Sequence, residues 1–153
     1  MTTTTPMHAT FTVEHFYSLT PDQVFAAWAD PAAKAQWFAG PRASHQLDFR
    51  VGGSELTRGR QADGPELTFA STYQEIRPAE LIVYSSTLSR ADTLATVSVT
   101  TVEFVPTEAG TRLVLTEYGV FLNELENPTW REQGTRTWLE QLTAHLSNHP
   151  PVV

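Results

Sequence analysis

The sequence has no cysteine, few basic residues and no long apolar run. Without cysteine the chain cannot form disulfides, thiolate metal sites or a cysteine nucleophile. Ten Lys and Arg residues stand against 17 Asp and Glu residues, which gives a net charge of -7. An acidic surface repels nucleic-acid phosphates and anionic membranes, so we expect neither as a partner. No apolar stretch approaches the ~18 residues that a membrane span needs.

The length of 153 residues suits one domain with a sizeable core. We expect residues 1–9 to be a disordered arm, residues 10–147 to be the folded domain, and residues 148–153 to be a tail. The first residues, "MTTTTPMHAT", lack the basic and apolar regions of a secretory signal, so we expect a cytoplasmic protein. An acidic chain stays soluble and homodimers are common, so we expect a monomer or a weak homodimer.

Three positions carry the same signature of a helix start. Thr20, Asp30 and Asn127 each place a capping oxygen directly before a proline. The oxygen accepts from N–H groups that have no partner in the helix, and proline at the first helical position gives up no hydrogen bond. The signature predicts two short helices, at about 21–29 and 31–38, and a long one at about 128–147.

Between the second and third helices the apolar residues recur with a period of two, which predicts about six antiparallel strands after an N-terminal one. Residues 45–51 read as a half-buried strand with Val51 inward, followed by a tight turn at Gly52 and Gly53. In residues 95–105 the apolar positions change from odd to even, which predicts a bulge near Thr100 and Thr101. The order of elements predicts an α+β fold, a curved antiparallel sheet with a long C-terminal helix and a space between them.

Four segments carry a family resemblance: "TPDQVFAAWADPAAKAQWFAGP" from residue 20, "VGGS" from 51, "YQEIRPAELIVYS" from 73 and "VEFVPTEAGTRLVLTEYGV" from 102. Together they resemble the START-like (SRPBCC) superfamily, and more closely its branch of activators of heat-shock-protein ATPase homologues. The resemblance implies a helix-grip fold, in which a seven-stranded sheet wraps around the C-terminal helix over a cavity. After Gly134 many relatives carry tryptophan, whereas this chain has Thr135, so we expect a larger or differently shaped cavity there.

The resemblance implies that the cavity binds a small hydrophobic or aromatic molecule. Two alternatives stay open: a cyclase, dehydratase or hydrolase that uses the same cavity, and a chaperone-binding protein of the stress response. We expect no cofactor. The five histidines are scattered without carboxylate ligands in phase, and "GGS" is followed by neither a lysine nor a helix, so we expect no metal site and no phosphate loop.

The ligand-binding candidates are residues expected to face the cavity from the short helices, the strands and the C-terminal helix: Trp28, Trp37, Phe38, Phe49, Phe69, Tyr73, Phe104, Leu115, Glu117 and Trp138. For the tryptophans, core packing is the favoured alternative.

Glu117 shares strand parity with Leu113 and Leu115, so its carboxylate should face inward, unless the strand end reaches solvent. There it could anchor a ligand hydroxyl or act as an acid or base. Tyr73 is the only polar partner that we nominate for it, with a solvated phenol as the alternative, so no catalytic residue is assigned. Because burial disfavours the charged form of a carboxylate, Glu117→Gln should leave the stability at neutral pH unchanged or raise it.

Overall fold

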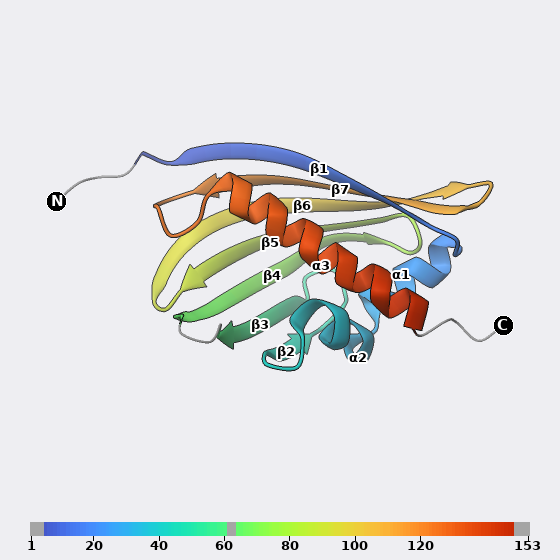
Figure 1. Cartoon of the computed structure of the whole chain (residues 1–153), viewed down its shortest axis with the longest axis horizontal. Helices are drawn as coiled ribbons and strands as arrows, with labels where there is room; N and C mark the ends of the chain where they lie inside the picture. Colours follow the sequence, from blue (N-terminus) through green and yellow to red (C-terminus); the bar gives the residue numbers. More distant parts are fainter. Residues whose placement is uncertain (1–4, 61–63, 149–153) are drawn as a thin grey trace.

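The computed structural model describes residues 5–60 and 64–148. Seven antiparallel strands form one curved sheet in the order β1-β7-β6-β5-β4-β3-β2, and the C-terminal helix crosses one face of it (Figure 1). The strands are β1 (Met7–Tyr17), β2 (Ser44–Leu47), β3 (Ser54–Arg60), β4 (Glu66–Arg77), β5 (Leu81–Arg90), β6 (Thr93–Thr107) and β7 (Gly110–Phe121). The helices are α1 (Pro21–Ala29), α2 (Pro31–Lys34), the π-helix η1 (Ala35–Ala39) and α3 (Pro128–Asn148). The α+β helix-grip fold is confirmed.

All three helix starts lie where the capping residues predict them. Thr20 forms a capping box with Gln23, in which each side chain accepts from the other residue's backbone N–H, at 3.3 and 2.9 Å. Asp30 accepts from the N–H of Ala32 at 3.2 Å, and Asn127 accepts from the N–H of Trp130 at 2.9 Å. The second helix widens into η1 and ends at Gly40, whose φ of 81° is a conformation that favours glycine.

The strand predicted over 45–51 is confirmed only as far as Leu47, and the prediction of a tight two-residue turn after it is wrong. β2 ends at Leu47, and Val51 lies in a turn with 55% of its surface exposed. Gly52 donates its N–H to the carbonyl of Tyr73, and Tyr73 donates its N–H to the carbonyl of Gly53. The two glycines therefore pair with β4 at the end of a longer loop, instead of closing a two-residue turn.

The bulge expected near Thr100 and Thr101 lies elsewhere. The register with β5 shifts at Ala95, and from there every even-numbered position of β6 through Phe104 is buried. Val97 and Val99 consequently face outward, with 40% and 47% of their surfaces exposed. The inward positions that precede Val102 are hydroxyl residues, namely Thr96, Ser98 and Thr100. The apolar residues of β6 suggested the wrong position for the bulge, because the inward-facing positions at this end of the sheet are polar.

The ends of the domain differ slightly from those expected. β1 begins at Met7, which pairs with Phe121, so residues 7–9 belong to a strand and not to the arm. α3 extends to Asn148. Residues 1–4 of the expected arm and 149–153 of the expected tail lie outside the described residues.

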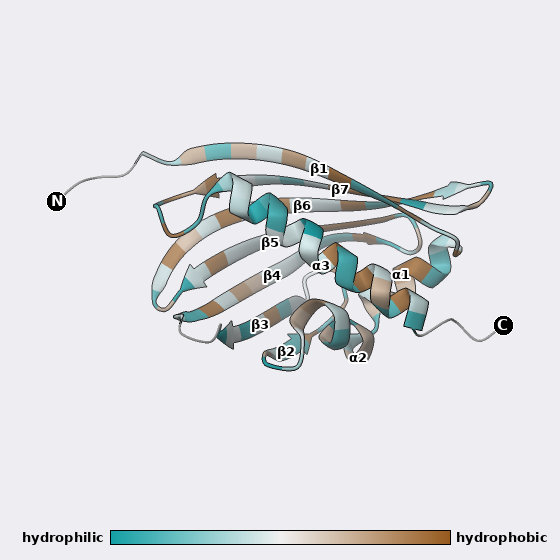
Figure 2. Cartoon of the chain, in the orientation of Figure 1, coloured by the Kyte–Doolittle hydropathy of each residue, from teal (hydrophilic) through white to brown (hydrophobic). Residues whose placement is uncertain are grey.

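The inner face of α3 changes character along its length. Its first buried residues are Arg131 and Thr135, and its later ones are Leu139, Leu142 and Leu146. Figure 2 shows the same division, with the first half of α3 mostly polar and brown apolar positions among the polar ones of the second half. The second half packs with α1 and η1 over the hydrophobic core, whereas the first half lies over the polar part of the sheet. None of the described helices is long and apolar enough to span a membrane.

Candidate functional site

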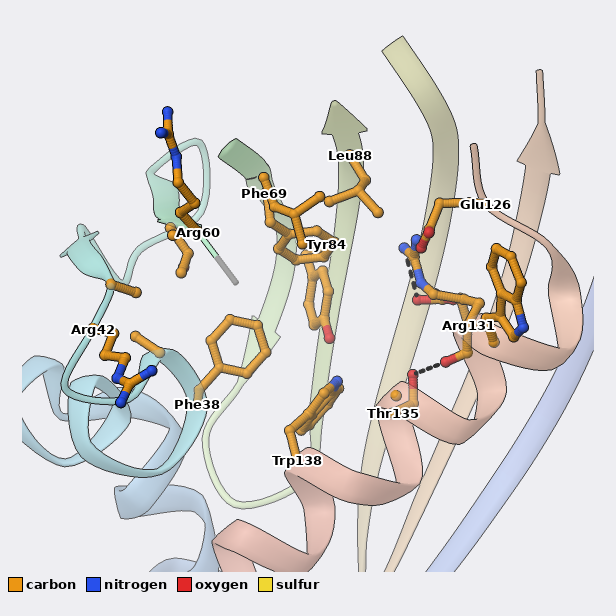
Figure 3. A pocket seen from close by; sticks show the side chains of 18 residues that line it. Phe38, Arg42, Arg60, Phe69, Tyr84, Leu88, Glu126, Arg131, Thr135 and Trp138 are labelled. Atoms are coloured by element: carbon orange, nitrogen blue, oxygen red, sulfur yellow. Dashed lines mark hydrogen bonds and ion pairs between the residues drawn. The ribbon is translucent and has the colours of Figure 1, made fainter. Parts of the chain in front are cut away.

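A pocket of about 630 Å³ lies beneath the first half of α3, opposite strands β3 to β5 (Figure 3). This volume is typical of a small-molecule site. Its walls come from η1 and the loop after it, from β3, β4, β5 and β7, and from α3 with the loop before it. They are made by Phe38, Ala39, Arg42, Ala43, Thr57, Gly59, Arg60, Leu67, Phe69, Tyr84, Leu88, Glu117, Glu126, Trp130, Arg131, Gly134, Thr135 and Trp138.

One wall of the pocket is aromatic. The ring of Phe38 lies 6.0 Å from that of Phe69 and 5.1 Å from that of Trp138, between centroids. These distances suit tilted and edge-to-face aromatic pairs. Gly134 on α3 leaves room beside this wall, because a Cβ atom added there would meet nothing within 4 Å. The pocket is therefore open where most helices would carry a side chain.

The opposite wall is a buried network of polar side chains. Arg131 Nε lies 2.9 Å from Glu117 Oε2, and the same guanidinium donates to Thr96 at 3.0 Å and to Ser98 at 3.1 Å. Thr100 donates to Glu117 Oε1 at 2.9 Å. Glu117 faces inward, as its strand parity predicts, but it has the charged partner that we had not foreseen. A buried ion pair with its remaining groups bonded is a rigid, preorganised wall.

Tyr84 adds a phenol to the pocket lining. Burial raises the pKa of Tyr84, and the nearby carboxylates of Glu117 and Glu55 raise it further, against the opposing hydrogen bond with Thr100 and the charge of Arg131. The phenol is therefore neutral at every ordinary pH. It can offer a hydrogen bond to a ligand but cannot serve as a base.

A second buried charged cluster lies next to the pocket but not on its lining. Glu55 Oε1 is 2.7 Å from Lys34 Nζ and accepts from the Tyr73 hydroxyl at 2.8 Å, while its Oε2 is 2.7 Å from His45 Nε2. Burial disfavours the ionised carboxylate, but the charge of Lys34 and the hydrogen bonds of His45, Lys34 and Tyr73 outweigh it, so the pKa of Glu55 falls to about 2. Burial, with the charge of Glu55 and their hydrogen bond, raises the pKa of Tyr73.

Comparison with known proteins shows the family to which this chain belongs. The model of the family described as activator of Hsp90 ATPase homolog 1-like protein matches residues 18–147. The chain belongs to this family. Its START-like fold is, in general terms, that of a family of ligand-binding domains.

Two solved structures are similar to this family member over nearly their whole length. One, from Rhizobium loti, is 40% identical with a TM-score of 0.88, over 94% of this chain and 100% of that one. The other, from Rhizobium leguminosarum, is 34% identical with a TM-score of 0.91, over 95% and 98%. A family protein from Silicibacter pomeroyi shares the fold at 19% identity, with a TM-score of 0.68 over 91% and 98%. No curated protein matches the chain.

The ten ligand-binding candidates suggested by the sequence divide between the pocket and the core. Phe38, Phe69, Glu117 and Trp138 line the pocket. The other six lie off its lining and pack in or against the core: Trp28, Trp37, Phe49, Tyr73, Phe104 and Leu115. Trp28 and Trp37 pack edge to face at 5.0 Å, which agrees with the core-packing alternative. Tyr73 bonds to Glu55 and therefore does not pair with Glu117.

The sequence interpretation missed the charged and hydroxyl residues of the pocket, above all Arg131. A signal for it was present in the spacing along α3. Arg131 lies four residues before Thr135 and eight before Leu139, on the buried face that the leucine stripe marks. A charged residue in phase with an apolar helix stripe indicates a buried partner.

Proposed function

We propose that the protein binds a small hydrophobic or aromatic molecule in the pocket between the sheet and the first half of α3. The observation that carries the proposal is a pocket of about 630 Å³ with an aromatic wall facing a hydrogen-bonded polar wall. Burial of apolar surface would supply most of the affinity, at roughly 25 cal/mol per Å² before the costs of association. The fixed polar groups would orient the ligand.

The polar groups support a binder over a cyclase, dehydratase or hydrolase. Both oxygens of Glu117 already contact Arg131 or Thr100, and the phenol of Tyr73 belongs to the neighbouring cluster. An acid–base catalyst needs a group within reach of the substrate whose proton is free to move. The chaperone-binding alternative, suggested by the family description, would use an outer surface and is independent of the pocket.

The test compares two substitutions of the same glycine by native mass spectrometry. Gly134→Ala adds one methyl group in open space, whereas Gly134→Phe places a ring in the pocket. Protein purified from its own source should carry a small molecule in the unmodified and Gly134→Ala forms, and lose it in Gly134→Phe. Equal retention in both variants, or no bound molecule in any form, would refute the proposal.

A further inference from the structure

We infer that the ligand is an amphipathic anion: an apolar, ring-containing body inside the pocket and a carboxylate, sulfonate or phosphate head at the rim, where Arg42 and Arg60 supply unpaired positive charge. This inference rests on the proposed function and adds the chemical class of the ligand. The inference follows from the charge around the pocket, which is net positive, whereas the net charge of the whole chain is negative.

The acidic chain places an excess of positive charge on this one pocket. Three of its ten basic residues line the pocket, against two of its 17 acidic residues. Both of those carboxylates are neutralised, Glu117 by Arg131 at 2.9 Å and Glu126 by Arg90 at 2.7 Å. Among the described residues, Arg42 and Arg60 have no acidic partner. Two guanidinium charges are thus left for a ligand.

The arrangement of the arginines indicates where the head binds. Arg42 follows η1 and Arg60 ends β3, and both lie on one side of the pocket, across from Arg131, with the aromatic rings between them (Figure 3). Their guanidinium groups lie apart and point away from each other, so they make this side of the rim positive without forming a single clamp. The guanidinium of Arg131 already bonds to its protein partners, so it offers little to a ligand anion. Arg42 and Arg60 are exposed, and an anion at the rim keeps part of its hydration.

The rim arginines contribute selectivity, and the apolar body contributes most of the affinity. Attractions between charges in contact with water are individually weak, and those of the two arginines for the head together amount to about a fivefold preference for an anion over a neutral analogue. The preference depends on salt, because charges near the surface are screened.

The experiment titrates two fluorescent probes that share one aromatic body. Anilinonaphthalene sulfonate carries an anionic head, and N-phenylnaphthylamine is the same aromatic amine without it. The sulfonate should bind about fivefold more tightly at low salt. Arg42→Gln combined with Arg60→Gln should bring the ratio of affinities close to one. Arg58→Gln is the matched control, because Arg58 is exposed on β3 between pocket residues and is not part of the lining, so the ratio should persist.

The outcomes separate this inference from the proposed function. Equal affinities for the two probes, or the same loss of preference in Arg58→Gln, would overturn the anionic head while the pocket remains a binding site. If Gly134→Phe leaves the binding of the neutral probe unchanged, the probe does not occupy the pocket, and the proposed function fails together with this inference.

Discussion

At the scale of single residues, the partner of Glu117 reverses the expected effect of Glu117→Gln. The substitution leaves the guanidinium of Arg131 buried without its counter-charge, and breaking a buried ion pair costs about 3 kcal/mol or more. We therefore expect the free energy of unfolding at neutral pH to fall by about 3 kcal/mol, as measured by denaturant titration. Glu132→Gln is the control, because its exposed pair with Arg136 contributes at most about 1 kcal/mol. An unchanged stability of Glu117→Gln would mean that the pair is not formed in solution.

A second prediction concerns a hydroxyl without a partner. The side-chain oxygen of Thr57 is buried and has no hydrogen-bond partner among the described residues. A buried hydroxyl without a partner destabilises the fold, because it has lost its hydrogen bonds to water. Thr57→Val should therefore raise the free energy of unfolding by about 1 kcal/mol. Thr111→Val is the same change at a hydroxyl that donates to the carbonyl of Leu19 at 2.7 Å, and it should destabilise by a similar amount. If the midpoints of thermal unfolding shift in the same direction for both variants, the hydroxyl of Thr57 is not an unpaired group.

At the scale of elements, Gly134 leaves α3 less stable than its length suggests. Glycine inside a helix costs up to about 1 kcal/mol relative to alanine. The space around it is open, so no close approach of the sheet explains the glycine. Gly134→Ala should therefore raise the free energy of unfolding by about 0.5–1 kcal/mol in a denaturant titration. Gly53→Ala should be strongly destabilising, because its Cβ would lie 2.1 Å from the carbonyl oxygen of Asp48. A destabilised Gly134→Ala would show that the helix needs flexibility at this point.

The elements themselves were predictable where local chemistry decides them. Helix starts at Thr20, Asp30 and Asn127 depend on one side chain and the proline after it, so the sequence locates them to the residue. The end of β2 was not predictable, because the glycines after it pair with Tyr73, some twenty residues away. Local patterns carry no information about such a partner.

The same reason explains why the charged residues of the candidate site and of the neighbouring cluster were missed. Lys34 and its partner Glu55 are 21 residues apart in the sequence, and Arg131 and Glu117 are 14 residues apart. Isolated charged residues are normally exposed, so each of these residues, considered without its partner, would be expected on the protein surface. The parity of Glu117 on its strand gave one usable signal, and the position of Arg131 on the buried face of α3 was a second one. A polar interior cannot be predicted from an apolar pattern, which is why the inward hydroxyls of β6 were placed outside.

At the scale of the whole molecule, the interior divides into an apolar end and a polar end. The leucines of α3 and the tryptophans of α1 and η1 form a core at one end, while Arg131 and the hydroxyls of β6 lie at the other. The apolar end is close-packed and supplies the hydrophobic stabilisation. The polar end carries the pocket, and its walls are held by hydrogen bonds and ion pairs. The hydrophobic core and the proposed binding pocket thus lie at different ends of one domain.

The buried carboxylate of Glu55 should make the stability of the whole molecule sensitive to acid. Its pKa falls from 4.5 to about 2 on folding, because Lys34, His45 and Tyr73 stabilise the ionised form more than burial disfavours it. A carboxylate with a lowered folded pKa contributes stability that is complete above the unfolded pKa and is lost as the pH falls through the folded one. The window therefore runs from pH 4.5 down to about pH 2, and the loss amounts to about 3 kcal/mol.

The measurement is a set of denaturant titrations across that window for the unmodified protein and for the double variant Lys34→Met/Glu55→Gln. The double variant removes the charges of Lys34 and Glu55 together, and the glutamine keeps an oxygen that can bond to His45, so it should fold. Its free energy of unfolding should fall less between pH 4.5 and pH 2, by about 3 kcal/mol, because it lacks the group that takes up a proton on unfolding. Asp48→Asn is the control at an exposed carboxylate paired with Arg50, and it should keep nearly the full acid dependence. Parallel curves for the unmodified protein and the double variant would mean that Glu55 titrates alike in the folded and unfolded chains, and that the cluster around it does not hold the charge.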